Sequence, residues 1–121
     1  MSGIVELSAD ARCKTIGQNF RCRAWVSFVG TSGSGTGHSD ITINASANVS
    51  SVTDNGAGNY AFTMTKAMPD NKYCAVGAGG IGGSFTAVKT TPDSTTVVGI
   101  DTSNDLGGWV DAGYVGCAVF R

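Results

Sequence analysis

Charged side chains are scarce in this sequence. They make up 14% of its 121 residues, and the eight basic and nine acidic residues leave a formal net charge of -1. Nucleic acids and anionic membranes are bound mainly by clustered Lys and Arg. The one local basic cluster, between Arg12 and Arg23, is explained by solvated side chains beside a strand or by contacts to a neighbouring subunit. We therefore expect neither nucleic acid nor membrane as a partner.

Long apolar runs are also lacking. None approaches the roughly 20 residues that a membrane-spanning helix needs, and the first residues, MSGIVELSAD, lack the pattern of a secretory signal. We therefore expect synthesis in the cytoplasm. Without secretion, the sequons at Asn44 and Asn48 have no route to glycosylation.

Cysteine and histidine are too few and too scattered to predict a metal site. The sequence has no Cys-x-x-Cys pair, and its single histidine, His38, lies in a Gly/Ser-rich segment. Cytoplasmic thiols stay reduced, and Cys22, Cys74 and Cys117 lie in apolar runs, so we expect these three to be buried thiols. Whether the four cysteines, Cys13 included, are free or paired stays open.

Residue pairs for catalysis are missing as well. Most of the acidic residues lie in predicted turns: Asp40, Asp54, Asp70, Asp93, Asp101 and Asp105. A Ser-His-Asp triad would need His38, which lies in a glycine-rich loop. Gly77–Gly82 matches G-x-G-x-x-G, but the following residues read as a strand and not as the helix that a dinucleotide site requires. We expect no enzyme activity, no cofactor and no metal.

The pattern that is abundant is alternation of apolar and polar residues, which is typical of β-strands. In Cys22–Phe28, every second side chain is apolar and should face a core. Further strands are predicted at Ile41–Ala45, Val49–Thr53, Tyr60–Thr65, Lys72–Ala78, Ser84–Thr90, Thr95–Ile100 and Tyr114–Phe120. Regular Gly, Pro, Asn and Asp turns between them predict an all-β fold, a jelly-roll-like antiparallel β-sandwich of roughly eight to ten short strands. The best helical stretch, Val5–Lys14, is short and partly polar.

Three connections can be predicted in more detail. The connection Val52–Tyr60 should be a hairpin that pairs Val49–Thr53 with Tyr60–Thr65, because its Asn and Gly residues accept positive φ. Met68–Asn71 should be a reversal after which Lys72–Val76 runs back along the same sheet. Gly77–Gly83 is predicted to be a flexible loop or bulge.

Aromatic residues exceed what one face of a small sandwich must bury. The set is Trp25, Tyr60, Tyr73, Phe85, Trp109 and Tyr114, and some of it is predicted to form a glycan platform or a subunit interface. Trp109 is the preferred contact residue, with packing over the end of the core as the alternative. The other candidate contact residues are Trp25 and four residues in or beside the glycine-rich loops: Gly35, His38, Gly80 and Ile81.

Several segments together resemble the C-terminal domain of tail fibre proteins from tailed phages, especially marine ones. They are RAWVSF from Arg23, ANVSSVTDNG from Ala47, GNY from Gly58, TKAMPDNKY from Thr65, and the final AVFR. The resemblance covers nearly the whole chain from Arg23 onward. It implies a homotrimeric β-sandwich on the virion surface, made in the host bacterial cytoplasm, that contacts other virion proteins and host surface polysaccharide.

The resemblance leaves two placements open. A tail fibre has an anchor and a shaft, whereas only residues 1–22 precede Arg23 here. We expect residues 1–20 to be an N-terminal arm or extra strand that serves as an anchor, and residues 21–121 to be the sandwich. The glycine-rich loops favour a short fibre or receptor-binding tip, and the missing shaft favours a capsid decoration protein that binds the outer shell as a trimer.

Overall fold

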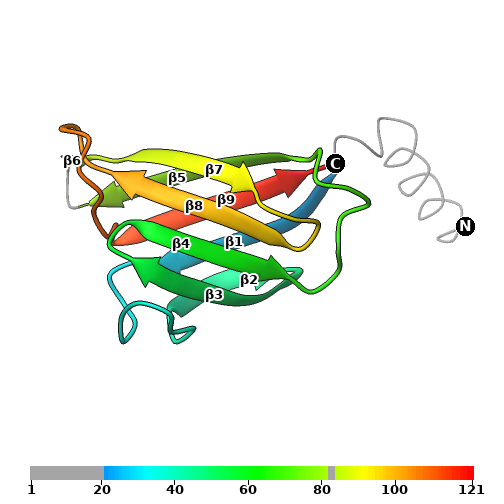
Figure 1. Ribbon diagram of the computed structural model, residues 1–121, viewed down its shortest axis with the longest axis horizontal. Coiled ribbons are helices and arrows are strands. Elements are labelled where there is room, and N and C mark those ends of the chain that lie inside the picture. The colour runs from blue at the N-terminus through cyan, green and yellow to red at the C-terminus, as the bar shows by residue number, and fades with distance from the viewer. Residues whose placement is uncertain (1–20, 82–83) are drawn as a thin grey trace, which may run out of the picture.

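The computed structural model describes residues 21–81 and 84–121, in which every regular element is a β-strand. The strands are β1 (Cys22–Val29), β2 (Thr42–Ala47), β3 (Val49–Gly56), β4 (Asn59–Met64), β5 (Cys74–Ile81), β6 (Ser84–Phe85), β7 (Ala87–Pro92), β8 (Val97–Ser103) and β9 (Tyr114–Phe120). Sheet A has the order β2-β1-β9-β5-β6 and sheet B the order β3-β4-β8-β7, with every pairing antiparallel. The two sheets lie face to face (Figure 1), so the predicted all-β sandwich is confirmed.

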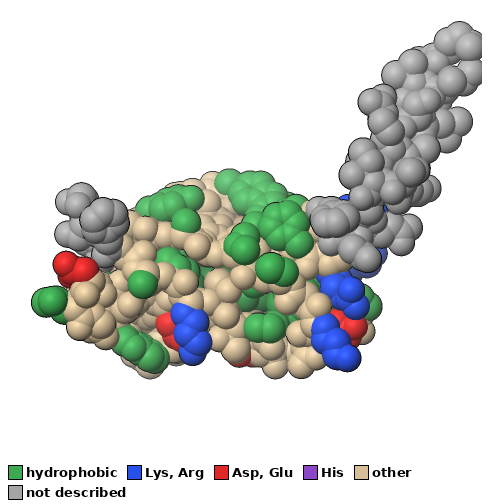
Figure 2. Space-filling model, turned by 90° about the horizontal axis from the view of Figure 1, so that it is seen from above, with side chains coloured by type: hydrophobic (Ala, Val, Ile, Leu, Met, Phe, Trp, Pro, Cys, Tyr) green, Lys and Arg blue, Asp and Glu red, His purple; other side chains and the backbone are tan. Residues whose placement is uncertain are grey.

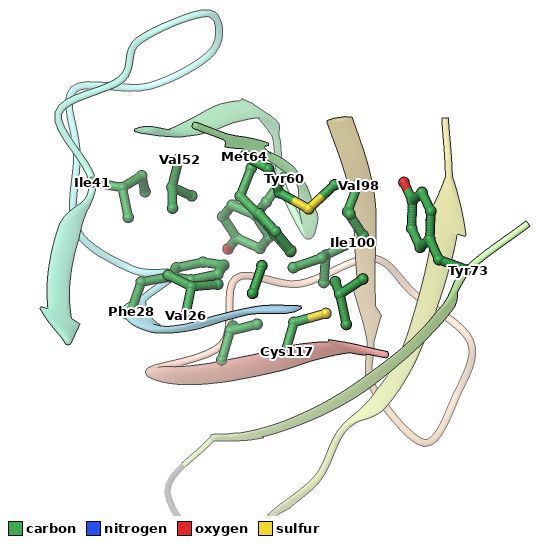
Figure 3. Close-up of a cluster of buried hydrophobic side chains, with 14 of the residues drawn as sticks. Val26, Phe28, Ile41, Val52, Tyr60, Met64, Tyr73, Val98, Ile100 and Cys117 are labelled. Carbon is green, nitrogen blue, oxygen red and sulfur yellow. The ribbon is translucent and has the colours of Figure 1, made fainter. Parts of the chain in front are cut away.

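The core lies between the two sheets, where side chains of alternate residues meet (Figure 3). Sheet A contributes mainly β1 and β9 and sheet B mainly β4 and β8: Ala24, Val26, Phe28, Val115, Cys117, Val119, Tyr60, Phe62, Met64, Val98 and Ile100. The rings of Phe28 and Tyr60 meet edge to face across the interior, with centroids 5.2 Å apart. Burying a large apolar side chain contributes about 1.5–3 kcal/mol, so this contact is central to holding the sheets together.

A single residue, Asn48, carries the chain from sheet A to sheet B. It lies between β2 and β3 with a φ of 56°, a left-handed conformation that Asn tolerates better than most residues. Its side-chain amide donates to the carbonyl oxygens of Arg23 (3.0 Å) and Lys66 (3.1 Å), and its Oδ1 accepts from the Lys66 N–H (2.6 Å). Asn48 therefore joins three segments at this corner.

The segment from Gly77 is not the predicted loop, because β5 continues through it to Ile81. Its glycines serve close packing against β7: a Cβ on Gly77 would lie 2.7 Å from a methyl carbon of Val88, and one on Gly79 would lie 3.2 Å from another. Nearby, Thr90 Oγ1 donates to the carbonyl oxygen of Ala75 (2.7 Å). Glycine within a strand often marks such a close approach, and here it brings the two sheets together along one side.

Two further expectations about strands are wrong. The chain after Met68–Asn71 does not return along β4, since β5 crosses to sheet A and pairs with β9. Ser84–Thr90 is also not one strand, because β6 pairs with β5 whereas β7 pairs with β8 in the other sheet. The chain changes sheets between β6 and β7, which alternation alone does not reveal.

The cysteines differ from the expectation in part. All three that lie in the described residues are free: Cys117 is buried, whereas Cys22 and Cys74 are exposed. Burial raises the pKa of the Cys117 thiol to about 12. Cys22 and Cys74 are the first residues of β1 and β5, at the margin of sheet A, where fewer neighbours surround a side chain. Cys13, the Val5–Lys14 stretch and the expected arm of residues 1–20 lie outside the described residues.

Candidate interaction surfaces

The candidate contact residues do not form one site. Trp25 lies on the outer face of sheet A, and Gly80 lies at the end of that face, paired with Tyr114. Gly35 and His38 lie in the loop between β1 and β2, whereas Trp109 lies in the loop between β8 and β9 and lines a groove beside β7 and β8. The side chain of Ile81 lies outside the described part of the structure. The candidate residues with described side chains therefore lie on separate parts of the molecule.

The outer face of sheet A is apolar and shallowly hollowed. A depression of about 410 Å³ runs over β1, β9 and β5, and none of the residues that line it is charged. Three large side chains on it are strongly exposed, Trp25 by 40%, Val76 by 51% and Tyr114 by 50%. Figure 2 shows hydrophobic side chains gathered along the sheet A side of the molecule, which is the upper side in that view. An uncharged surface of this kind is typical of a face that another molecule covers.

Tyr114 lies flat on this face because residue 116 is glycine. A Cβ on Gly116 would lie 2.7 Å from the Tyr114 hydroxyl oxygen and 3.3 Å from the ring carbon that bears it. The ring therefore lies along β9, over Gly116. The neighbouring outward positions, Ser27 on β1 and Ala78 on β5, are in register with Gly116 and are also small. The sheet A face is thus a low floor bordered by large exposed side chains.

The second surface is the loop end of the sandwich. The β1–β2 loop, the β3–β4 hairpin and the β8–β9 loop all lie at the end of the sandwich opposite to the one where β1 begins and β9 ends (Figure 1). A buried cluster joins their bases. Asp111 Oδ1 accepts hydrogen bonds from the Gly58 N–H (2.8 Å) and the Tyr60 hydroxyl (2.7 Å), and that hydroxyl also lies 3.0 Å from the Gly30 carbonyl oxygen.

We call this group of hydrogen-bonded residues the Tyr60–Asp111 cluster, and it shifts the pKa of Tyr60. Burial, and then the adjacent Asp111 carboxylate, raise the pKa of Tyr60 far above its usual value, so the phenol stays a hydrogen-bond donor at all ordinary pH. The sequence offered no sign of the role of Asp111, because its partners Gly58 and Tyr60 are more than 50 positions away.

The β1–β2 loop is attached to the edge of sheet B. The Asp54 N–H donates to the His38 carbonyl oxygen (3.0 Å), and the Gly37 N–H donates to the Asp54 carbonyl oxygen. Within the loop, the Ser34 hydroxyl and its N–H both donate to the Asp40 carboxylate, and these bonds lower the pKa of Asp40. At the tip, Gly35 has positive φ, and a Cβ on it would meet nothing within 4 Å. The loop base is therefore fixed and the tip is open to solvent.

Trp109 lies on a loop whose backbone is well connected. Asn104 Oδ1 accepts from the N–H groups of Leu106 (3.1 Å) and Gly108 (2.8 Å), and Ser103 and Trp109 form an antiparallel bridge. Trp109 is 57% exposed and Leu106 is 90% exposed. Such exposure does not fit the alternative in which Trp109 packs over the end of the core, and its role as a contact residue stays a prediction. The role of Asn104 was not predicted, although Asn, Asp and Gly, which all occur between Asn104 and Gly108, are common turn residues.

Within the described residues, no three His, Cys, Asp or Glu side chains are grouped so that they could hold a metal ion. The described part of the chain also contains no helix of the length and apolarity that crossing a membrane would require. Compared with known proteins, the chain matches no family model, no curated protein and no solved structure.

Proposed function

We propose that this domain is a structural, non-enzymatic module of a phage virion surface, a short fibre or receptor-binding tip that contacts polysaccharide on the host. The observation that carries the proposal is the division of the sandwich into two ends. The chain enters β1 and leaves β9 at one end, and three loops with exposed Trp109 and Leu106 lie at the other. Such an arrangement suits a module that is attached at one end and makes contacts at the other. The sequence resemblance supports the same assignment.

The placement is tested by labelling purified virions with antibody against the domain and imaging them. We expect label at the tail tip, and we expect the purified domain to compete with virions for adsorption to host cells. Label on the capsid shell would contradict the receptor-binding tip and favour the capsid decoration protein. Virions without label on any structure would contradict both placements.

We propose further that the module is a homotrimer whose subunits meet through the sheet A face. None of the residues that line the depression on this face is charged, so three copies can pack it around a common axis without burying an unpaired charge, and a net charge of -1 gives copies little mutual repulsion. Its exposed Trp25 and Tyr114 belong to the residue types that are enriched in the cores of protein interfaces.

The Val76→Glu variant tests this interface. A carboxylate buried without a partner costs several kcal/mol, so we expect the variant to be monomeric while the parent protein has three times the 12.3 kDa mass of one chain. The measurement is light scattering at micromolar concentration, with circular dichroism to verify the fold. Thr63→Glu, on the outer face of sheet B, is the matched control and should remain trimeric. A monomeric parent protein, or a folded Val76→Glu variant that stays trimeric, would overturn the proposal.

A further inference from the structure

A polar groove crosses the outer face of sheet B, away from the sheet A face. Lys89, Asp101 and Asn59 lie side by side on β7, β8 and β4 because the strand register places them in one row. Lys89 Nζ lies 3.5 Å from Asp101 Oδ2, and Asn59 Nδ2 donates to Asp101 Oδ1 (2.8 Å). The Lys89 side chain is 74% exposed and that of Asp101 is 23% exposed, so the row faces solvent.

The row beside it is built of small residues and forms a floor. Gly99 and Ala61 are paired here, and the Asp93 carboxylate lies over Gly99, where a Cβ would come 2.8 Å from Asp93 Oδ2. The resulting hollow has a volume of about 280 Å³, and Asn55 also lines it. Its walls therefore carry two carboxylates, two amides and one ammonium group.

A second hollow of about 300 Å³ continues from the first toward the loop end. Lys89 and Asp101 line both hollows, and Ser103 and Trp109 line only the second. The two hollows thus adjoin at Lys89 and Asp101, with the exposed Trp109 in one and Asp93 in the other. Each hollow is at the low end of the range for small-molecule sites, which is roughly 300–1,000 Å³.

We propose that this groove, from Trp109 across Lys89 and Asp101 to Asn59 and Asp93, binds a neutral saccharide. Sugar hydroxyl groups both donate and accept hydrogen bonds, and the groove offers carboxylates that accept, an ammonium that donates and amides that do both. The flat apolar face of Trp109 suits the C–H face of a sugar ring. An open groove also accommodates a few units within a long chain, whereas a closed pocket would take only a chain end.

The charge of the groove selects among saccharides. Two carboxylates, Asp93 and Asp101, face one ammonium, Lys89, so the groove is acidic on balance. Uronic and sialic acids would bring a further negative charge next to these carboxylates and are disfavoured. The source of the saccharide, a host surface polysaccharide, rests on the proposed function, whereas the site itself rests on the groove alone.

The test begins with the purified full-length protein on an array that carries neutral, uronic-acid and sialic-acid glycans. We expect binding to neutral glycans and titrate the tightest one by calorimetry. Trp109→Ala and Asp93→Asn should each weaken its affinity about tenfold or more. The matched controls are Leu106→Ala and Asp105→Asn, which alter the same loop without touching the groove, and both should bind as the parent protein does.

Three results would overturn the saccharide site. These are an array without neutral-glycan binding, Trp109→Ala and Asp93→Asn variants that retain affinity, and control variants that weaken binding equally. The outcome is separable from virion placement: groove-dependent binding without virion label contradicts the proposed function alone, and virion label with groove-independent binding contradicts the saccharide site alone. Release of reducing ends from the bound glycan would contradict the non-enzymatic role, because Asp93 and Asp101 would then act as a hydrolytic pair.

Discussion

Phe28→Ala is expected to lower the free energy of unfolding by about 3–5 kcal/mol, the usual cost of truncating a buried Phe. The Phe28 side chain is fully buried and contacts Tyr60 across the interior, so its removal leaves a cavity between β1 and β4. Urea denaturation at one fixed protein concentration measures the loss, because association of subunits would otherwise change the apparent stability.

The neighbouring position supplies the control for this variant. Val29 follows Phe28 on β1 and is only half-buried. Val29→Ala should therefore cost roughly 1 kcal/mol or less. If Phe28→Ala fails to fold, Phe28→Leu keeps most of the volume and should lose roughly 1–2 kcal/mol. Equal losses of unfolding free energy for Phe28→Ala and Val29→Ala would contradict the burial of Phe28 against Tyr60.

Gly58→Ala is expected to destabilise the protein by about 3 kcal/mol or more, through two causes that add. Gly58 has a φ of +66°, where a side chain costs about 1–2 kcal/mol. In addition, a Cβ there would clash with the Thr102 carbonyl oxygen and lie 2.7 Å from the Val110 nitrogen, and both are backbone atoms that cannot easily move. The measurement is again urea denaturation.

Gly107→Ala separates the two causes. Gly107 has a φ of +81°, but a Cβ there would meet nothing within 4 Å. This variant should therefore lose only the conformational cost of about 1–2 kcal/mol. Losses of equal size at Gly58 and Gly107 would show that Gly58 is not tightly enclosed by Thr102 and Val110.

The parts of the fold that were predicted correctly depend on local pattern. In β1, alternation places Val26 and Phe28 in the core and Trp25 outside, and in β9 the same alternation buries Val115 and Val119. The β3–β4 hairpin followed from the Asn and Gly residues between Val52 and Tyr60, whose conformational preference acts within a few residues, although the turn itself lies at Ala57-Gly58. Local chemistry therefore fixes strands and tight turns well.

The predictions that were wrong concern features that depend on residues distant in the sequence. Glycines such as Gly77 favour a loop unless a second strand packs against them, and that strand contains Val88, eleven positions later. The passage between sheets after β6 is likewise set by where β7 finds a partner, which is β8. Nothing within either segment encodes these partners.

The same limit applies to the candidate sites. Trp109 could be selected as a contact candidate, because it follows two glycines in a segment without alternation, but the sequence left packing over the end of the core equally open. The row of Asn59, Lys89 and Asp101 was not predictable, because three strands from different parts of the chain must pair in register before these side chains meet. Each of the three residues alone reads as an ordinary turn or surface position.

The Tyr60–Asp111 cluster also has a consequence for how this protein can evolve. It fixes the bases of three loops with hydrogen bonds, while a Cβ at tip positions such as Gly35 and Gly107 would meet nothing within 4 Å. Insertions at the tips, and substitutions there that spare the glycines with positive φ, therefore change little of the folding energy. A lineage can therefore exchange these tips and still inherit an intact scaffold.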